Sequence, residues 1–363
     1  MKIAQVAPLF ERVPPRAYGG TERVISYLTE ELVRQGHEVT LFASGDAITE
    51  ARLVSSIDQS LRPDAGRPAW LAYHAIQMDQ VSAMASKFDI IHFHTDYQHF
   101  PLARRLPTAH VTTMHGRLDL PELVPLFEHF HDVPLVSISN SQRAPLPAAN
   151  WRATVHHGLP PSLYAFEPEH SGYFAFVGRV SPEKRIDRAI EIAQRCGTRL
   201  VIGAKIDQAD EPYFNQCIKP LMQSPLIEYI GEIDEREKRQ LLQHAAALLF
   251  PIDWPEPFGL VMIEAFCCGT PVIAYRNGAV PEIMEEGITG FIVDSQDEAV
   301  LAAQRIGVID RRRCREAFER RFTVRHMAQA YLRVYEQVIA ARQPRAIDRH
   351  PAGVGRLAGV PGN

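Results

Sequence analysis

Residues 253–275 read DWPEPFGLVMIEAFCCGTPVIAY, and the change of pattern along this stretch decides the fold. The prolines on either side of Glu256 keep that segment extended, because proline lacks an N–H and restricts the residue before it. Apolar residues from Leu260 onward favour a helix, and Gly269 is suited to end it. Residues 270–274 then read as a buried strand. The stretch therefore predicts a loop, a short helix and a strand of an α/β protein.

Gly259 and two glutamates make this stretch a candidate binding site. Gly259 lets the backbone approach a ligand closely, and the first amides of the helix behind it have no partner within the helix. Such amides suit an anion or a hydroxyl-rich ligand. Glu256 lies just before the helix and Glu264 lies inside it, so a ligand spread along the helix could contact both. The alternative is an ordinary loop–helix–strand unit whose two glutamates have no function.

The spacing Glu256-x7-Glu264, with Pro-Phe-Gly after the first glutamate and the strand Gly-Thr-Pro-Val-Ile-Ala, resembles the signature of retaining GT-B glycosyltransferases, in particular glycosyltransferase family 4. The resemblance covers the chain up to about residue 341 and is sharpest in the second half. It implies an α/β fold of the GT-B type. In that fold two Rossmann-like domains with parallel sheets face each other across a cleft, and a C-terminal helix crosses back to the first domain.

Composition and charge fit an ordinary protein of two domains. The 363 residues are 46% hydrophobic and 23% charged, and the net charge of −4 gives no indication of nucleic-acid binding. The five cysteines are odd in number and form no C-x-x-C pair, which indicates reduced thiols in the cytoplasm. The chain enters a strand directly after Met1, and we expect neither a signal peptide nor a membrane-spanning segment.

The first half alternates strands and helices. Residues 2–7 and 38–43 read as strands, and the amphipathic segment 21–35 reads as a helix that Thr21 caps and Gly36 ends. This βαβ opening predicts a doubly wound parallel sheet. The first strand is not followed by G-x-G-x-x-G, which argues against a dinucleotide oxidoreductase. Further strands are expected at residues 87–94, 109–114, 135–139 and 154–159.

The loop at residues 8–20 is longer than usual for a strand-to-helix connection, and long loops at this edge of a sheet usually carry function. Gly19 and Gly20 precede the helix, whose free amides could face a phosphate. The resemblance implies that this glycine pair lies against the diphosphate of a sugar donor. A flexible hinge is the alternative interpretation.

Two predicted strands end in histidine, His94 and His115, and both side chains should reach the same cleft at the carboxyl edge of the sheet. By the resemblance, His115 lies near the donor sugar and hydrogen-bonds a hydroxyl. A structural histidine with satisfied partners is the alternative. His92 and His94 share a strand face without a third fixed ligand. We therefore expect no metal, and the family usually needs none.

The second half begins with a strand at residues 173–177 and the segment Gly-Arg-Val-Ser-Pro-Glu-Lys. Ser181 has the chemistry of a helix cap, and Asp187 is an alternative cap. Arg179 and Lys184 stand at a strand end beside a helix N-terminus, which suits phosphate and resembles the family's diphosphate clamp. Two solvated basic residues are the alternative. Further strands are expected at residues 199–203, 227–231, 247–250 and 289–293, and helices at 234–246, 297–306 and 323–341.

Two more segments resemble parts of the family's donor site. Residues 231–233 lie where the family holds its nucleobase, and residues 276–282 resemble the glycine-rich turn after the second glutamate, with Ala279 in place of one glycine. The basic run at residues 311–315 predicts a solvated helix face, and a weak association with a membrane surface stays open. The expected units are a first domain at residues 1–167, a second at 168–322, a terminal helix at 323–342 that packs on the first domain, and a tail at 343–363 without packed structure.

The resemblance implies a retaining transferase that moves a hexose-type sugar from a nucleotide-diphosphate sugar to an acceptor hydroxyl, with UDP favoured over GDP and no cofactor. The acceptor could be a sugar, a lipid-linked sugar or a small molecule. By family analogy Glu264 accepts the ribose hydroxyls and Glu256 those of the transferred sugar. The catalytic candidates are His115 and Glu256, and the donor-binding candidates are Gly19, Gly20, Arg179, Lys184, Phe258, Gly259, Leu260, Val261 and Glu264.

Three rival functions fit the same frame. A nucleotide-sugar epimerase or a phosphorylase that uses a sugar phosphate could share the GT-B fold, and a catalytically silent scaffold of this fold could bind a partner protein. The joint presence of the candidate cations, carboxylates and His115 argues against the scaffold.

Overall fold

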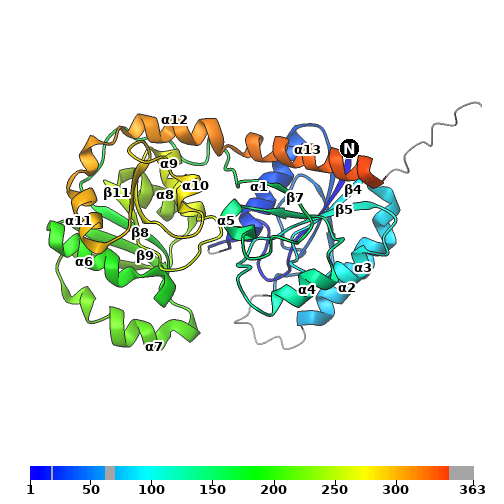
Figure 1. Cartoon of the computed structure of the whole chain (residues 1–363), viewed down its shortest axis with the longest axis horizontal. Helices are drawn as coiled ribbons and strands as arrows, with labels where there is room; N and C mark the ends of the chain where they lie inside the picture. Colours follow the sequence, from blue (N-terminus) through cyan, green and yellow to red (C-terminus); the bar gives the residue numbers. More distant parts are fainter. Residues whose placement is uncertain (18, 62–69, 343–363) are drawn as a thin grey trace, which may run out of the picture.

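The structure is a computed structural model that describes residues 1–17, 19–61 and 70–342. The described residues form two α/β domains that lie side by side (Figure 1), each built on one parallel sheet. Among the described residues, no helix is both long and apolar enough to cross a membrane. The predicted tail at residues 343–363 lies outside the described residues. The predicted domain boundary near residue 167 stays a prediction.

The first domain has a seven-stranded sheet with the spatial order β3-β2-β1-β4-β5-β6-β7, so the order reverses at its first strand. In such sheets ligands bind outside the carboxyl ends of the strands, near the reversal. The elements are β1 (Lys2–Val6), α1 (Gly20–Arg34), β2 (Glu38–Ala43), β3 (Arg52–Ser55), α2 (Trp70–Met84), β4 (Ile90–Phe93), α3 (Phe100–Ala103), β5 (Ala109–Thr113), α4 (Leu123–His129), β6 (Leu135–Ser137), α5 (Asn140–Arg143) and β7 (Trp151–Thr154).

The second domain has a six-stranded sheet with the order β10-β9-β8-β11-β12-β13, which also reverses at its first strand. Together the two sheets confirm the expected GT-B architecture. The elements are β8 (Phe174–Arg179), α6 (Ile186–Cys196), β9 (Leu200–Lys205), α7 (Glu211–Tyr213), β10 (Ile227–Gly231), α8 (Glu235–His244), β11 (Ala247–Phe250), α9 (Leu260–Cys268), β12 (Val272–Tyr275), α10 (Val280–Ile283), β13 (Gly290–Val293), α11 (Gln296–Gln304) and α12 (Arg311–Arg321).

The chain crosses between the domains twice, and the two crossings are joined by backbone hydrogen bonds. The amide of Leu159 donates to the carbonyl of Phe322 at 2.8 Å, and the amide of Val324 donates to the carbonyl of Leu159 at 2.8 Å. Gly158 lies against this junction, where an added Cβ would stand 2.4 Å from the carbonyl oxygen of Thr323. The two crossings therefore form one joint.

The terminal helix α13 (Val324–Arg342) returns to the first domain, as expected, and lies along the same side of the molecule as α12 (Figure 1). Its apolar face belongs to the core between α1 and the first sheet. Tyr331 and Tyr335 are fully buried there, and Gln5 of β1 donates to the Tyr335 hydroxyl at 3.0 Å. Removing this helix would expose a large part of that core to water.

Two local expectations are wrong, and one strand was not predicted. No strand forms at residues 154–159: β7 ends at Thr154, and His157 leaves the sheet to pack its ring on Phe258 of the second domain, with ring centroids 4.7 Å apart. The apolar character of the segment reflects burial between the domains. Thr21 does not cap α1, because the cap position belongs to Gly19, whose φ of 151° is open to glycine. Finally, β3 is an edge strand with no buried residue, so its apolar pattern is weak.

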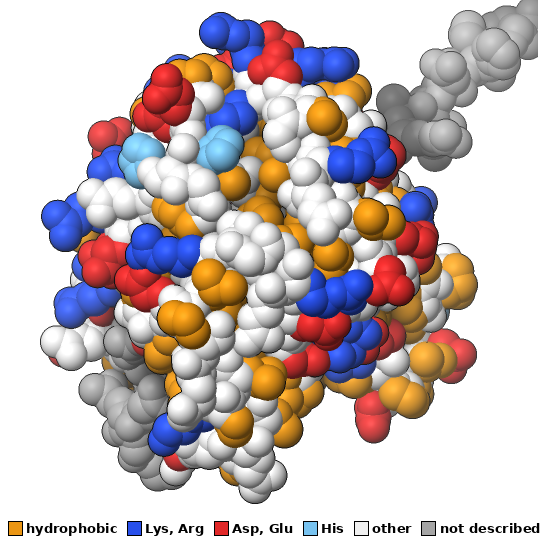
Figure 2. All heavy atoms as spheres, turned by 90° about the vertical axis from the view of Figure 1, so that its left-hand side faces the viewer, with side chains coloured by type: hydrophobic (Ala, Val, Ile, Leu, Met, Phe, Trp, Pro, Cys, Tyr) orange, Lys and Arg blue, Asp and Glu red, His pale blue; other side chains and the backbone are white. Residues whose placement is uncertain are grey.

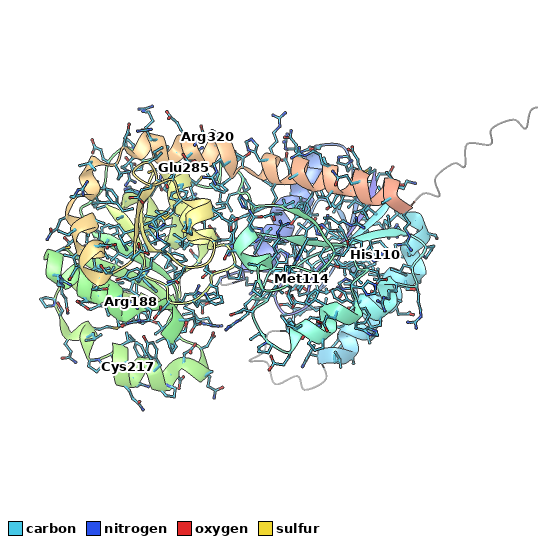
Figure 3. The ribbon with its side chains drawn as sticks, viewed as in Figure 1. His110, Met114, Arg188, Cys217, Glu285 and Arg320 are labelled. Atoms are coloured by element: carbon cyan, nitrogen blue, oxygen red, sulfur yellow. The ribbon has the colours of Figure 1, made fainter. Side chains whose placement is uncertain are left out.

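The predicted solvated face at residues 311–315 is also wrong in part. Arg311 is buried and donates to the carbonyls of Glu167 and Ala245, both at 2.8 Å, while Arg315 donates to the carbonyl of Cys267 at 2.7 Å. These guanidinium groups are held inside because they satisfy otherwise unpaired carbonyls. Farther along α12, Arg320 pairs with Glu285 at 2.7 Å (Figure 3). On the outer face of the second domain, cationic and anionic side chains are interspersed among the described residues (Figure 2).

Buried histidines are the unusual feature of the first domain's core. His99 Nε2 forms a hydrogen bond of 2.7 Å with Thr112 Oγ1, and the His99 ring stacks on Phe93 with ring centroids 3.8 Å apart. Burial lowers the pKa of every member of this group, and that of His110 to about 4. The buried histidines of the first domain are His74, His92, His94, His99, His110 and His157.

We predict that Gly158→Ala loosens the joint between the crossings. The added methyl group would collide with the Thr323 carbonyl oxygen, so the two segments must separate, at a cost of about 2 kcal/mol for an overpacked site. Differential scanning calorimetry should show a lower Tm. Gly307→Ala is the matched control, because nothing lies within 4 Å of its added Cβ. Equal Tm values for the two variants would contradict the prediction.

We predict that stability falls as pH drops below about 6.5. The buried histidines stay neutral in the folded state, whereas in the unfolded chain they take up protons near pH 6.5. Their contribution is therefore complete above that pH and declines below it, by about 1.4 kcal/mol per histidine per pH unit. Urea unfolding at pH 7.5, 6.5 and 5.5 measures this slope. His99→Gln should make it shallower, and His131→Gln, at an exposed position, should not.

Candidate active site

A cleft of about 560 Å³ lies between the carboxyl ends of the two sheets and is lined by both domains. In Figure 3, Met114 lies nearer the second domain than His110, so β5 runs toward this cleft. A larger hollow of about 800 Å³ lies at the amino ends of β1 and β2, beside Lys2 and Glu38. At that edge the first strands only begin, and the lining includes Val33 and Met84 from the C-terminal ends of α1 and α2, so the cleft is the better candidate.

The N-terminus of α9 forms one wall of the cleft. Gly259 occupies its cap position with φ 84°, a left-handed conformation that favours glycine, and no side chain caps the helix. The first amides of α9 are therefore available to a ligand. Gly20 of α1 lies opposite, where an added Cβ would be 3.3 Å from Leu260 Cδ1. Two uncapped helix N-termini thus meet at the cleft. The ring of Phe258 is buried, so only its backbone is available there.

Glu256 is held by both its side chain and its backbone. Lys184 Nζ forms an ion pair with Glu256 Oε2, and the indole N–H of Trp254 donates to the same oxygen at 3.0 Å. The predicted turn at residues 276–282 packs on the backbone of Glu256, and the Ala279 amide donates to its carbonyl at 2.9 Å. Gly278 has φ 55° and leaves no room for a Cβ, which explains the glycine in that turn.

Glu264 is only 3% exposed and has a cation of its own. Lys238 of α8 donates to Glu264 Oε1 at 2.6 Å and lies 3.3 Å from Glu235. Glu235 in turn pairs with Arg23 of α1, so this chain of charges crosses the cleft from the second domain to the first. A carboxylate buried this deeply needs such a partner. The sequence analysis did not identify Lys238, Glu235 or Arg23.

A signal for Lys238 does exist in the sequence. Residues 238, 241, 242 and 245 share one helical stripe, and the last three are Leu, Leu and Ala. A lysine on an apolar stripe indicates a cation directed at a buried anion. Arg23 and Glu235 carry no comparable signal, because their contact joins different domains.

Arg179 stands at the end of β8, among carboxylates. Its guanidinium is 2.7 Å from Glu183 and 3.6 Å from Asp207 and Asp210. The helix predicted to start at Ser181 is a single turn at residues 182–184, because Arg185 takes a left-handed φ of 52° and α6 starts only after it. The cap position of α6 belongs to Arg185 instead of Asp187, and Asp187 pairs with Arg185 at 2.8 Å.

His115 lies at the end of a hydrogen-bonded chain. Its Nε2 is 2.8 Å from His94 Nδ1, and His94 Nε2 is 2.8 Å from Gln5 Oε1. Since Gln5 Nε2 donates to Tyr335, Gln5 Oε1 must accept from His94 Nε2–H, and His94 Nδ1 then accepts from His115 Nε2–H. His115 Nδ1 is left as an acceptor without a partner among the described residues. Burial lowers the pKa of His115 to about 3, so the ring is neutral.

The structure brings all eleven candidates to this one cleft, together with Glu232 and Ile233 of the expected nucleobase segment. His94 lies behind His115. In the described part of the chain, no group of three or more His, Cys, Asp or Glu side chains is placed to hold a metal. The candidates that line the cleft are Gly19, Gly20, His115, Arg179, Lys184, Glu256, Phe258, Gly259, Leu260, Val261 and Glu264.

Comparison with known proteins gives matches to both halves. The family described as Glycosyl transferases group 1 matches residues 165–322, and Glycosyltransferase Family 4 matches residues 18–154. An uncharacterized glycosyltransferase of Methanocaldococcus jannaschii is 24% identical over 338 residues, which are 81% of this chain and 85% of that protein. This chain matches seven further curated relatives over only 37–48% of their length.

Two solved structures share the fold. Sucrose-phosphate synthase from Thermosynechococcus elongatus has a TM-score of 0.77 at 18% identity, covering 94% of this chain and 99% of that chain. Anabaena HepE, in complex with UDP and glucose, has a TM-score of 0.72 at 18% identity and covers 93% and 100%. Since the two family matches together span most of the chain and the fold agrees, the chain belongs to the group 1, family 4 glycosyltransferases of the GT-B fold.

Proposed function

We propose that this chain is a retaining glycosyltransferase, active without a metal, that moves a hexose-type sugar from a nucleotide-diphosphate sugar to an acceptor hydroxyl. One observation carries the proposal: Arg179, Lys184, Glu256 and Glu264 line a single cleft where the N-termini of α1 and α9 meet. Cations and helix amides suit a diphosphate, and carboxylates suit the hydroxyls of sugar and ribose. Two cations and two helix N-termini can supply the positive charge that a metal provides elsewhere.

UDP is the proposed carrier. HepE, which shares the fold, has been solved with UDP and glucose. We expect the base beside Glu232 and Ile233, the ribose hydroxyls at Glu264, and the diphosphate between Lys184 and the amides of Gly19 and Gly20. The cleft volume lies in the usual range for ligands of this size, roughly 300–1,000 Å³.

Donor binding is then an exchange of partners. Lys184 and Trp254 both occupy Oε2 of Glu256, and Lys238 occupies Oε1 of Glu264. A diphosphate draws Lys184 toward its own charge and leaves Glu256 to accept hydroxyl protons. The second oxygen of Glu264 serves the ribose. If the ligand lacks the hydroxyl that replaces Lys184, Glu256 is left without that partner, which makes the site selective.

In the transfer step, the bond between the anomeric carbon and the diphosphate oxygen breaks as the bond to the acceptor oxygen forms on the same face. The leaving phosphate oxygen takes the proton of the acceptor hydroxyl. Lys184, Arg179 and the helix amides stabilise the charge that grows on the diphosphate, which is preorganised electrostatic stabilisation. Neutral His115 offers Nδ1 to a hydroxyl of the sugar. We place the enzyme in the cytoplasm, because the five cysteines are all free.

We predict that UDP binds this cleft and that Lys184→Ala and Glu264→Gln each raise its Kd by about 10- to 100-fold, or about 1.4–2.8 kcal/mol. Lys184→Ala removes the charge that meets the diphosphate, and Glu264→Gln the acceptor for the ribose. Isothermal titration calorimetry measures both. Lys219→Ala, on the exposed surface, is the control for loss of a lysine and should bind as the wild type does. If both site variants bind UDP with the Kd of the wild type, this placement of the nucleotide is refuted.

We predict that the product keeps the anomeric configuration of the donor. Proton NMR of the anomeric doublet distinguishes retention from inversion, and an inverted product would exclude front-face transfer. Glu256→Gln should lower kcat/KM about 100-fold, since it removes a charged acceptor at the reacting sugar. Incubation with the nucleotide sugar alone separates an epimerase, which would change the sugar without an acceptor.

A further inference from the structure

A second hollow, of about 240 Å³, adjoins the cleft on the side of the first domain. Four residues line both spaces: Thr21, Glu22, His115 and Gly116. The hollow therefore opens where the transferred sugar would be held against His115. A pocket this small, below the roughly 300 Å³ typical of drug-sized ligands, takes a single ring.

The electrostatic character of this hollow is opposite to that of the donor cleft. The donor cleft carries Arg179 and Lys184. The described residues that line the hollow include the carboxylates Glu22 and Asp96 but no lysine or arginine. A phosphate would meet two carboxyl groups and no counterion among the described residues, whereas hydroxyls or an ammonium group would meet acceptors.

A few acceptor atoms in the hollow have no partner, or only a local one, among the described residues. Glu22 is 7% exposed, and its carboxylate has a hydrogen bond only from its own backbone amide among the described residues. Gln98 Oε1 and His115 Nδ1 are buried atoms without a partner there. Buried acceptors are normally satisfied. Since His115 Nδ1 is assigned to the donor sugar, Gln98 Oε1 and the remaining acceptor positions of the Glu22 carboxylate indicate a ligand rich in hydrogen-bond donors.

An aromatic wall completes the hollow. Phe10 lines it, and its ring lies 5.3 Å from that of Trp70 and 5.2 Å from that of His74, measured between centroids. Pockets for small molecules combine such apolar walls with a few directed polar groups. The apolar face of a saturated ring can lie against Phe10 while its hydroxyls reach Glu22 and Gln98.

We propose that this hollow holds the acceptor and that the acceptor is a single hydroxyl-rich ring, neutral or bearing an amine, rather than a phosphorylated one. The proposal rests on the proposed function, since it takes His115 and the adjoining cleft as the donor side. Glu22 is its central binding group, because it is shared between the two spaces and its carboxylate can accept the hydroxyl nearest the donor sugar. Burial raises the pKa of Glu22 to about 7, and the described part of the chain places no cation against it.

The test compares matched probes on the UDP-loaded full-length protein by calorimetry or ligand-observed NMR. The pairs are glucosamine with glucosamine 6-phosphate and glucose with glucose 6-phosphate. We expect the unphosphorylated member of at least one pair to bind at least tenfold more tightly than its phosphate. Equal or tighter binding of the phosphates, or no binding by any of the four probes, would overturn the proposal.

Two variants keep the result independent of folding. Glu22→Gln should weaken the unphosphorylated probes tenfold or more, and Glu128→Gln, exposed on α4, should not. Gln98→Lys places a cation in the hollow and should improve glucosamine 6-phosphate binding at least tenfold, a gain that a misfolded protein cannot show. No change in either variant would refute the assignment. If UDP itself fails to bind the wild type, the proposed function falls first and the acceptor site with it; if UDP binds and the probes disagree, only the acceptor site falls.

Discussion

The joint at Leu159 and Thr323 is the constraint on which the rest of the molecule depends. Two reciprocal backbone hydrogen bonds and the bare backbone of Gly158 hold both crossing segments at one place. From there the chain enters the second domain on one side and returns as α13 on the other. The buried tyrosines of α13 anchor that return in the first core. Because both crossings share one joint, the carboxyl ends of the two sheets face each other and the cleft has two walls.

The donor side of this cleft is balanced in charge. Glu256 and Glu264 each pair with a lysine, and burial of either carboxylate alone would be costly. Ligand hydroxyls and phosphates therefore replace partners that these charged side chains already have. Glu22 is different, because it is buried and no cation is found beside it among the described residues. The two spaces beside His115 thus bind ligands differently. In the donor cleft a ligand replaces existing ion pairs, whereas in the hollow it supplies hydrogen-bond donors to acceptors that have few partners.

Local signals explain what could be predicted from the sequence. The helix, cap and strand at residues 253–275 can be predicted because proline, glycine and the spacing of apolar residues determine backbone conformation within a few residues. The eleven candidates follow from motifs at strand ends, and the structure gathers them in one cleft. The failures are tertiary. His157 is buried against Phe258 of the second domain, and Arg311 is buried because it donates to backbone carbonyls such as that of Ala245. Glu22 becomes a candidate binding residue only because loops distant in sequence complete the hollow around it. The spacing of apolar residues along the sequence does not predict such contacts between distant segments.

The terminal helix contributes to the chemistry as well as to the fold. Tyr335 accepts from Gln5, which fixes Gln5 Oε1 toward His94 and so sets the tautomers of His94 and His115. Without this chain either ring could turn, and His115 could present N–H instead of a lone pair. Burial keeps both rings neutral. A neutral acceptor is what a sugar hydroxyl needs beside a growing oxocarbenium charge, since an imidazolium there would oppose it. The distant C-terminal helix therefore sets the hydrogen-bonding state at the centre of the cleft.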